Sequence, residues 1–244
     1  MPDPVLVAVA HGSADPRASA TIAELAALVR ERQQGLDLRT AFLGHAPPSL
    51  PQVLGTIAAD REVTVLPLLL TAAYHSKADI PRMLARTPRA RVRYGATLGP
   101  HPLLLAALDR RLAEADPGAY ENPGSTAVVL AAAGSSDPEA NATIAAMAAQ
   151  WQARAGWLAV RPAYASAAEP DPAAAVAGLL RDGAPRVVVA TYLLAPGLFA
   201  DRIRQSALAA GAAAVSPALG ACAEVADVLL DRFAEAVSHK RTAA

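Results

Sequence analysis

The sequence is short of cysteine, of net charge and of long uninterrupted apolar runs. Cys222 is the single cysteine in 244 residues, so no disulfide can form within the chain. Lys and Arg together number 22, as do Asp and Glu, whereas nucleic-acid-binding proteins usually carry a basic excess. The apolar runs are of strand length or are broken, as at Pro196 and Gly197, so neither a signal peptide nor a membrane span is expected. These absences predict a soluble cytoplasmic protein without a nucleic-acid or membrane partner.

The sequence contains an internal duplication. The segments "GSADPRASATI" (12–22) and "GSSDPEANATI" (134–144) share 8 of 11 residues. Two further pairs follow in the same order: "VTVLPLLLTAAYH" (63–75) with "VVVATYLLAPGLF" (187–199), and "TLGPHPLLLAALDRRL" (97–112) with "ALGACAEVADVLLDRF" (218–233). The repeats predict two domains, 1–116 and 127–238, joined by a linker near 116–126.

Within the first half, strand and helix patterns alternate. Continuous apolar runs predict strands at 4–10, 37–43, 62–70 and 90–97, and helices are expected from Pro16 to about Gln33, near 50–59, around Pro81 and over 102–115. Asp15 followed by Pro16 is typical of a helix start. The alternation predicts an α/β fold of two tandem doubly wound parallel-sheet domains.

Four histidines follow predicted strands of the first half, at the sheet edge where α/β proteins bind ligands. They are His11, His45, His75 and His101, and the aligned residues of the second half are Ala133, Ala167, Phe199 and Cys222. The loops "HGS" and "TAAYHSKADIP" leave room for a ligand, which favours function for His11 and His75. A hydrogen-bonded loop histidine is the alternative for each; His101 also fits a helix cap and His45 a turn. Neutral imidazole binds divalent transition metals and also accepts protons near neutral pH.

Cationic side chains near these loops are candidates for anion binding. Arg17 lies in the first turn of its predicted helix and can reach a carboxylate, and the helix N-terminus itself favours anions. Lys77 follows His75. Helix capping by Asp15 and ordinary surface solvation are the alternatives for these charges.

The motifs "HGSADPRA", "PLLLTAAYHSKADIP" and "LGPHPLL" resemble those of the sirohydrochlorin chelatases of the CbiX/SirB type, in their long two-half form. The resemblance covers nearly the whole chain. It implies a chelatase-like fold with the site in the cleft between the halves. It also implies ATP-independent insertion of Fe²⁺ or Co²⁺, or Ni²⁺ in some members, into sirohydrochlorin, for siroheme or cobalamin biosynthesis. The metal would be a substrate, with no permanently bound cofactor.

The resemblance also implies roles for individual residues. His11 would be the proton acceptor and a metal ligand, and His75 the other ligand. The substrate-binding residues would be Ser13, Arg17, Leu69, Leu70, Thr71, Ala72, Ala73, Tyr74 and Lys77. The chain departs from the family pattern where Ala73 and Tyr74 precede His75 in place of a glycine, and where His45 follows Gly44 in place of an acidic residue. His45 is therefore a candidate additional ligand.

Other functions remain open at this point. The same histidines could hold a metal or a metallated tetrapyrrole for delivery without catalysis, or His11 could serve a phosphate-transfer hydrolase. A purely structural duplicated domain is a further alternative. The sequence leaves open iron, cobalt or nickel, and a monomer or a homodimer.

Overall fold

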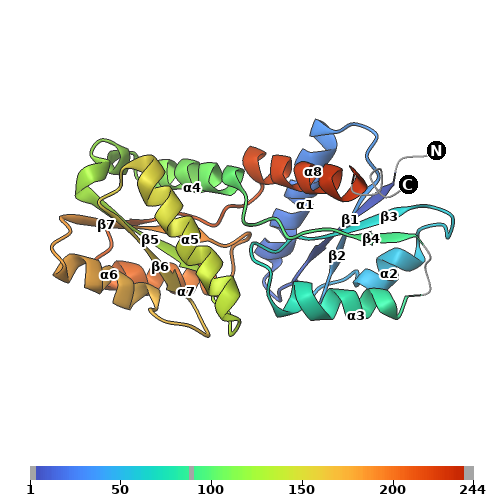
Figure 1. Ribbon diagram of the computed structural model, residues 1–244, viewed down its shortest axis with the longest axis horizontal. Helices are drawn as coiled ribbons and strands as arrows, with labels where there is room; N and C mark the ends of the chain where they lie inside the picture. Colours follow the sequence, from blue (N-terminus) through green and yellow to red (C-terminus); the bar gives the residue numbers. More distant parts are fainter. Residues whose placement is uncertain (1–3, 88–90, 239–244) are drawn as a thin grey trace. The chain divides into compact units, whose positions relative to one another are not determined.

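The computed structural model describes residues 4–87 and 91–238, which form two compact units (Figure 1). The first unit contains the chain up to Leu103 and again from Ala221, and the second contains Leu104–Gly220. Each unit has one four-stranded parallel sheet with helices on both faces. The predicted α/β class, with two tandem doubly wound sheets, is confirmed.

In the first unit the strand order is β2-β1-β3-β4, and every pair is parallel. Helices α1 and α8 cover one face and α2 and α3 the other (Figure 1). The elements of this unit are β1 (Val5–Ala10), α1 (Pro16–Arg32), β2 (Leu38–Phe42), α2 (Leu50–Gly55), β3 (Val63–Pro67), α3 (Ile80–Ala85), β4 (Val92–Tyr94) and α8 (Ala223–Ser238). All of β1 is buried, as its continuous apolar sequence predicts.

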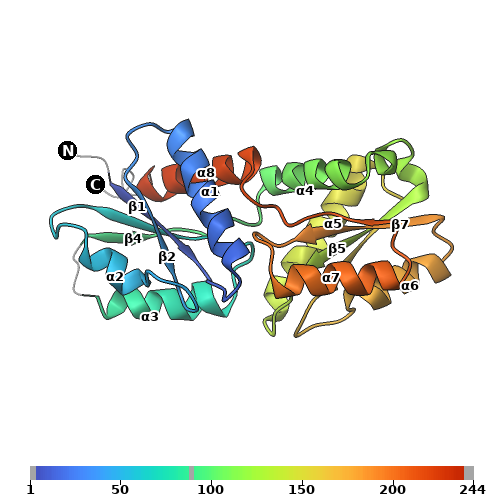
Figure 2. The ribbon, with the colours of Figure 1, turned by 180° about the vertical axis from the view of Figure 1, so that it is seen from behind.

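The second unit repeats this topology with the strand order β6-β5-β7-β8. Helices α4 and α5 cover one face and α6 and α7 the other (Figure 2). Its elements are α4 (Pro102–Ala115), β5 (Thr126–Ala132), α5 (Pro138–Ala155), β6 (Ala159–Tyr164), α6 (Pro172–Arg181), β7 (Arg186–Tyr192), α7 (Leu198–Ala209) and β8 (Ala214–Val215). The predicted linker holds two short 3₁₀ turns, Pro117–Tyr120 and Pro123–Ser125.

The compact units differ from the two halves of the sequence repeat. Helix α4 follows β4 in the chain, but from Leu104 onward it belongs to the second unit. Helix α8 ends the second half of the sequence and packs on α1 and β3 of the first unit. The chain thus passes between units at 103–104 and again at 220–221, whereas the predicted domains are 1–116 and 127–238. The two helices occupy equivalent positions in the repeat, so each can cover the same face of either sheet.

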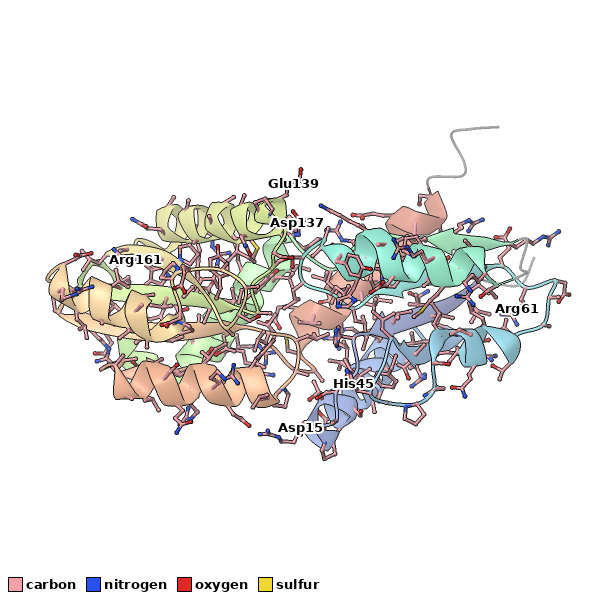
Figure 3. All side chains as sticks on the ribbon, turned by 90° about the horizontal axis from the view of Figure 1, so that it is seen from below. Asp15, His45, Arg61, Asp137, Glu139 and Arg161 are labelled. Carbon is pink, nitrogen blue, oxygen red and sulfur yellow. The ribbon has the colours of Figure 1, made fainter. Side chains whose placement is uncertain are left out.

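The turn after the first strand of each sheet is built in the same way. Gly12 and Gly134 have φ of 87° and 84°, and a Cβ there would lie 1.8 Å from the Gly44 carbonyl oxygen and 1.9 Å from that of Ser166. Only glycine combines this backbone conformation with so close an approach. The following helices start alike, since Asp15 accepts a hydrogen bond from the Arg17 amide and Asp137 from that of Glu139 (Figure 3).

A half-buried carboxylate anchors α4 in the second unit. Asp109 accepts hydrogen bonds from Trp151 Nε1 at 2.7 Å and from the Tyr120 hydroxyl at 3.0 Å, and it pairs with Arg154. Trp151 is fully buried. Burial and, to a lesser extent, the adjacent carboxylate of Asp109 raise the pKa of Tyr120, so its hydroxyl stays a donor. This cluster joins α4, the linker and α5.

Replacing Gly12 by alanine is expected to destabilise the first unit far more than the same change at Gly35. Both residues have positive φ, but nothing lies within 4 Å of a Cβ at Gly35. Gly35→Ala should therefore cost only the conformational penalty of about 1–2 kcal/mol, and Gly12→Ala about 2 kcal/mol more through its clash with the Gly44 carbonyl. Urea denaturation followed by circular dichroism measures both, and equal losses would contradict the role given to the close approach.

Asp109→Ala is expected to destabilise the second unit by about 1–3 kcal/mol, because it leaves the buried indole N–H of Trp151 without an acceptor. The matched control is Asp182→Ala, which removes an exposed ion pair with Arg161 and should cost about 1 kcal/mol or less. Trp151 and Trp157 are the only tryptophans of the chain and both lie in this unit. Urea denaturation followed by their fluorescence therefore reports on it directly, and equal midpoints for the two variants would refute this assignment.

Candidate functional site

His11 and His75 lie at the carboxyl edge of the first sheet, after its two central strands. His11 directly follows β1, and His75 lies in the loop after β3. Strands β1 and β3 are neighbours. From β1 the chain continues to β2 at one edge of the sheet, and from β3 it continues to β4 at the other edge. The strand order reverses at this point, which is where doubly wound sheets bind their ligands.

The two imidazoles are in direct contact. Their Nε2 atoms are 3.2 Å apart, and the rings meet edge to face with centroids separated by 4.6 Å. His11 is exposed and the His75 side chain is 42% accessible. A dissolved ion or molecule can therefore reach both nitrogens.

Hydrogen-bond partners assign a tautomer to each ring. The Nδ1 of His11 lies 3.0 Å from the Gly12 carbonyl oxygen, and the Nδ1 of His75 lies 2.6 Å from Oδ2 of Asp79. Both partners only accept hydrogen bonds, so each Nδ1 carries the hydrogen and each Nε2 presents a lone pair. Two lone pairs at 3.2 Å repel each other unless a cation lies against both, so the pair is suited to bind a metal ion or a proton.

The spacing of the two nitrogens fits one divalent transition metal. Nitrogen ligands lie about 2.0–2.1 Å from such ions. The Nε2 atoms are 3.2 Å apart. An ion about 2.0–2.1 Å from both would therefore have an N–metal–N angle of about 100°, between the octahedral and tetrahedral values. The pair can thus hold an ion on one side and leave its other positions to water or substrate.

His45 lies beside the pair without completing it. Its ring is nearly parallel to that of His11, with the centroids 6.3 Å apart, and the side chain is exposed (Figure 3). The backbone of His45 has φ of 61°, and the aligned Ala167 has φ of 59°, so this conformation belongs to the duplicated scaffold. Among the described residues, no group of three or more His, Cys, Asp or Glu side chains is arranged to hold one ion.

His101 is held in a structural role at the start of α4. Its Nδ1 accepts a hydrogen bond from the Leu103 amide at 3.3 Å, and its Nε2 lies 3.6 Å from Asp231. The side chain is only 15% exposed. These contacts agree with the helix cap considered from the sequence.

The loop that carries His75 is held by its own hydrogen bonds. Residues His75–Asp79 form a single π-helical turn, a distortion that is frequent at functional sites. The Ser76 hydroxyl bonds to both the amide and the carbonyl of Ala73, and the Tyr94 hydroxyl donates to the Ser76 carbonyl. Burial raises the pKa of Tyr94 to about 12, so this donor keeps its proton across the physiological range.

The residues predicted to bind substrate lie around the pair, several of them engaged within the protein. The Ser13 hydroxyl accepts from the Asp15 amide, and Arg17 forms an ion pair with Asp15 that holds the pKa of that carboxyl below its usual value. Tyr74 is 57% exposed, its ring centroid is 5.9 Å from that of His75, and Arg82 donates to its hydroxyl. Lys77 is exposed. The stretch Leu69–Ala73 is exposed or half-buried.

Two residues at this edge were not predicted. Asp79 contacts His75 directly, and Arg82 lies over Tyr74 with its guanidinium carbon 6.0 Å from the ring centroid. The spacing of His75 and Asp79 in "HSKADIP" was the available signal, since side chains four residues apart meet on one side of a helical turn.

Comparison with known proteins agrees with the resemblance seen in the motifs. The model of the CbiX family matches the chain twice, over residues 5–115 and 127–236. The sirohydrochlorin cobaltochelatase of Priestia megaterium is 27% identical over 81% of this chain and 66% of its own length. The sirohydrochlorin ferrochelatase of the same organism is 26% identical over 81% of this chain and 75% of its own length.

Solved structures share the fold. SirB from Bacillus subtilis with Fe³⁺ superposes with a TM-score of 0.82 at 24% identity, over 98% of both chains. A complex of SirB from Bacillus subtilis subspecies spizizenii with cobalt gives 0.77 at 22% identity, over 96% of this chain and 95% of the other. The double match of the family model corresponds to the two predicted halves and covers most of the sequence. The chain belongs to the CbiX family.

Proposed function

We propose that this protein inserts a divalent metal ion, Fe²⁺ or Co²⁺, into sirohydrochlorin without ATP. The observation that carries the proposal is the pair of imidazole Nε2 atoms 3.2 Å apart at the carboxyl edge of the first sheet. The matched relatives are a cobaltochelatase and a ferrochelatase that act on sirohydrochlorin. The metal is a substrate in this proposal, and no permanently bound cofactor takes part.

In the proposed reaction, the Nε2 atoms of His11 and His75 release one metal ion and take up two protons. Metal insertion requires the two pyrrole N–H protons of the macrocycle to leave as the ion enters. His11 and His75 bind the ion through Nε2 and displace part of its water shell. When the ion passes to the macrocycle nitrogens, both Nε2 lone pairs become free, and each can accept one proton. The products are the metallated tetrapyrrole and two imidazolium groups, which return their protons to solvent.

The carboxylate groups of the substrate call for donors around the pair. We assign this role to Arg17 and Lys77 as cations, to Ser13 as a polar contact, and to the α1 N-terminus. For Arg17 it means that the carboxylate of Asp15 shares the guanidinium with a substrate carboxylate or is displaced by it. The exposed ring of Tyr74 and the stretch Leu69–Ala73 supply apolar contact with the macrocycle.

His45 enters the proposal as an additional ligand. Its exposed ring would turn toward the pair and contribute a third nitrogen at the position where an acidic residue was expected from the family pattern. A nitrogen in place of an oxygen favours later transition metals, such as Co²⁺ over Fe²⁺.

None of the described helices is long and apolar enough to span a bilayer. A cytoplasmic location, and a monomer or homodimer as the working form, stay predictions.

His11→Ala and His75→Ala are each expected to lower the kcat/KM for metal insertion by about 100-fold or more, because each removes both a ligand and a proton acceptor. The assay mixes the protein with sirohydrochlorin and Fe²⁺ or Co²⁺ without oxygen and follows the visible spectrum. His101→Ala is the matched control and should stay close to wild type, since that imidazole caps α4.

Three measurements distinguish the functions considered: metal insertion, binding without turnover, and hydrolysis of phosphate esters. Catalysed insertion that both substitutions abolish supports a chelatase and shows its preferred metal. Tight metal or tetrapyrrole binding without turnover would instead favour a delivery protein. Hydrolysis of phosphate esters that depends on His11 would favour the phosphate-transfer alternative.

His45→Ala is expected to reduce the preference for Co²⁺ over Fe²⁺, and His45→Glu to shift it further toward Fe²⁺, because a carboxylate oxygen is a harder ligand than imidazole. The measurement is the ratio of kcat/KM values for the two metals in each variant. An unchanged ratio in both variants would remove His45 from the ligand set.

A further inference from the structure

The carboxylate of Asp79 lies behind the imidazole of His75, on the side away from His11. Its Oδ2 is 2.6 Å from Nδ1 of His75, a short charge-assisted hydrogen bond. We propose that Asp79 is a positioning residue: it keeps the hydrogen of His75 on Nδ1 and aims the Nε2 lone pair at the metal. The inference rests on the proposed function, in which this metal is the substrate.

The other aspartates at comparable helix starts make a different contact. Asp15, Asp137 and Asp171 each stand directly before a proline, and each side chain accepts a hydrogen bond from a backbone amide of the helix that follows. Asp79 precedes Ile80 and Pro81 in the same kind of sequence, but its side chain makes no capping bond. Its carboxylate is turned to the imidazole instead, so helix capping does not explain it.

The backbone holds Asp79 in place independently of the imidazole. The Ile80 amide donates to the His75 carbonyl, which closes the π-helical turn. The bonds between Ser76 and Ala73, together with the Tyr94 hydroxyl on the Ser76 carbonyl, fix the start of the same turn. The backbone on either side of the carboxylate is therefore held by the turn, and Oδ2 of Asp79 contacts the His75 ring from this position.

This acceptor decides which nitrogen of His75 can bind a metal. In a neutral imidazole, the nitrogen that carries the hydrogen is set by the hydrogen bond that the ring makes. Without Asp79, the hydrogen can move to Nε2, which then has no lone pair to offer beside His11. The Nδ1 of His11 contacts the Gly12 backbone carbonyl, which no side-chain substitution removes, whereas the Nδ1 of His75 contacts the side chain of Asp79, which a substitution can change.

The second half of the duplication supports a shared role for His75 and Asp79. The residue aligned with His75 is Phe199, and four residues further on stands Ile203, fully buried in the apolar core. The imidazole and the carboxylate are thus absent together where the fold is retained. A carboxylate needed only for the fold would be expected in both halves.

The test combines a spectroscopic readout with metal affinity, both without the tetrapyrrole. Long-range ¹H–¹⁵N correlation spectra report the tautomer of each histidine, and the spectrum of His75→Ala assigns the His75 signals. Wild type is expected to show the Nδ1–H form at His75, and Asp79→Ala a substantial Nε2–H population.

Co²⁺ titration followed by visible absorption should show a loss of affinity of about 10–100-fold for Asp79→Ala. Asp79→Asn should lose less, because its amide oxygen still accepts from Nδ1–H. Asp171→Ala, which removes a capping aspartate of the second unit, should leave the tautomer and the affinity unchanged.

An unshifted His75 tautomer, or equal Co²⁺ affinity in wild type, Asp79→Asn and Asp79→Ala, would overturn the proposal. If Asp79→Ala does not fold, Asp79→Asn decides, because a neutral amide is a weaker acceptor and wild-type affinity in this variant would contradict the role. These readouts use Co²⁺ alone. A shifted tautomer and weakened binding would support the positioning role even if wild type failed to metallate sirohydrochlorin, and that failure would count against the proposed function alone.

Discussion

The parallel pairing of β1 with β3 is the constraint on which the site depends. Both strands are buried and end at the same edge of the sheet, which brings residues 64 positions apart into contact. The chain leaves β1 toward β2 and β3 toward β4, in opposite directions across the sheet, and doubly wound sheets bind ligands at such a reversal. The positive φ of Gly12 and its approach to the Gly44 carbonyl then turn the chain sharply, directly after His11. The position of the imidazoles follows from backbone geometry before any side-chain contact is considered.

The duplication separates what the fold needs from what the chemistry needs. The second unit keeps the strand order, the glycine turn, the aspartate cap and even the positive φ at the position aligned with His45. It lacks every imidazole of the first half. Since the second unit keeps the scaffold without His11, His45 or His75, the contact between the Nε2 atoms of His11 and His75, 3.2 Å apart, is better explained by binding than by folding.

The candidate site combines solvent-exposed side chains with a turn that is held by hydrogen bonds. His11 and Tyr74 are open to solvent, whereas the turn that carries His75 is fixed by the hydroxyl groups of Ser76 and Tyr94. Such an arrangement lets an ion enter and leave while the ligand nitrogens keep their direction, as a reaction that transfers the ion requires. The neutral net charge of the chain does not oppose the proposed function, in which Arg17 and Lys77, close to His11 and His75 in the sequence, would bind the carboxylates of the substrate.

The sequence by itself determined the α/β class and the duplication, and it predicted His11 and His75 as candidate site residues at one edge of the first sheet. Strand and helix periodicity, turn residues and strand-end positions are local properties, and these conclusions required nothing more. The tertiary structure alone decided that α4 and α8 belong to opposite units from their sequence halves, because the apolar pattern of a helix does not specify which of two similar sheets it covers. It also decided that Asp79 faces an imidazole, that Arg17 is paired with Asp15, and that His101 caps a helix. Each of these is a choice among partners within reach of one side chain, and such a choice depends on distances and directions that a linear pattern does not contain.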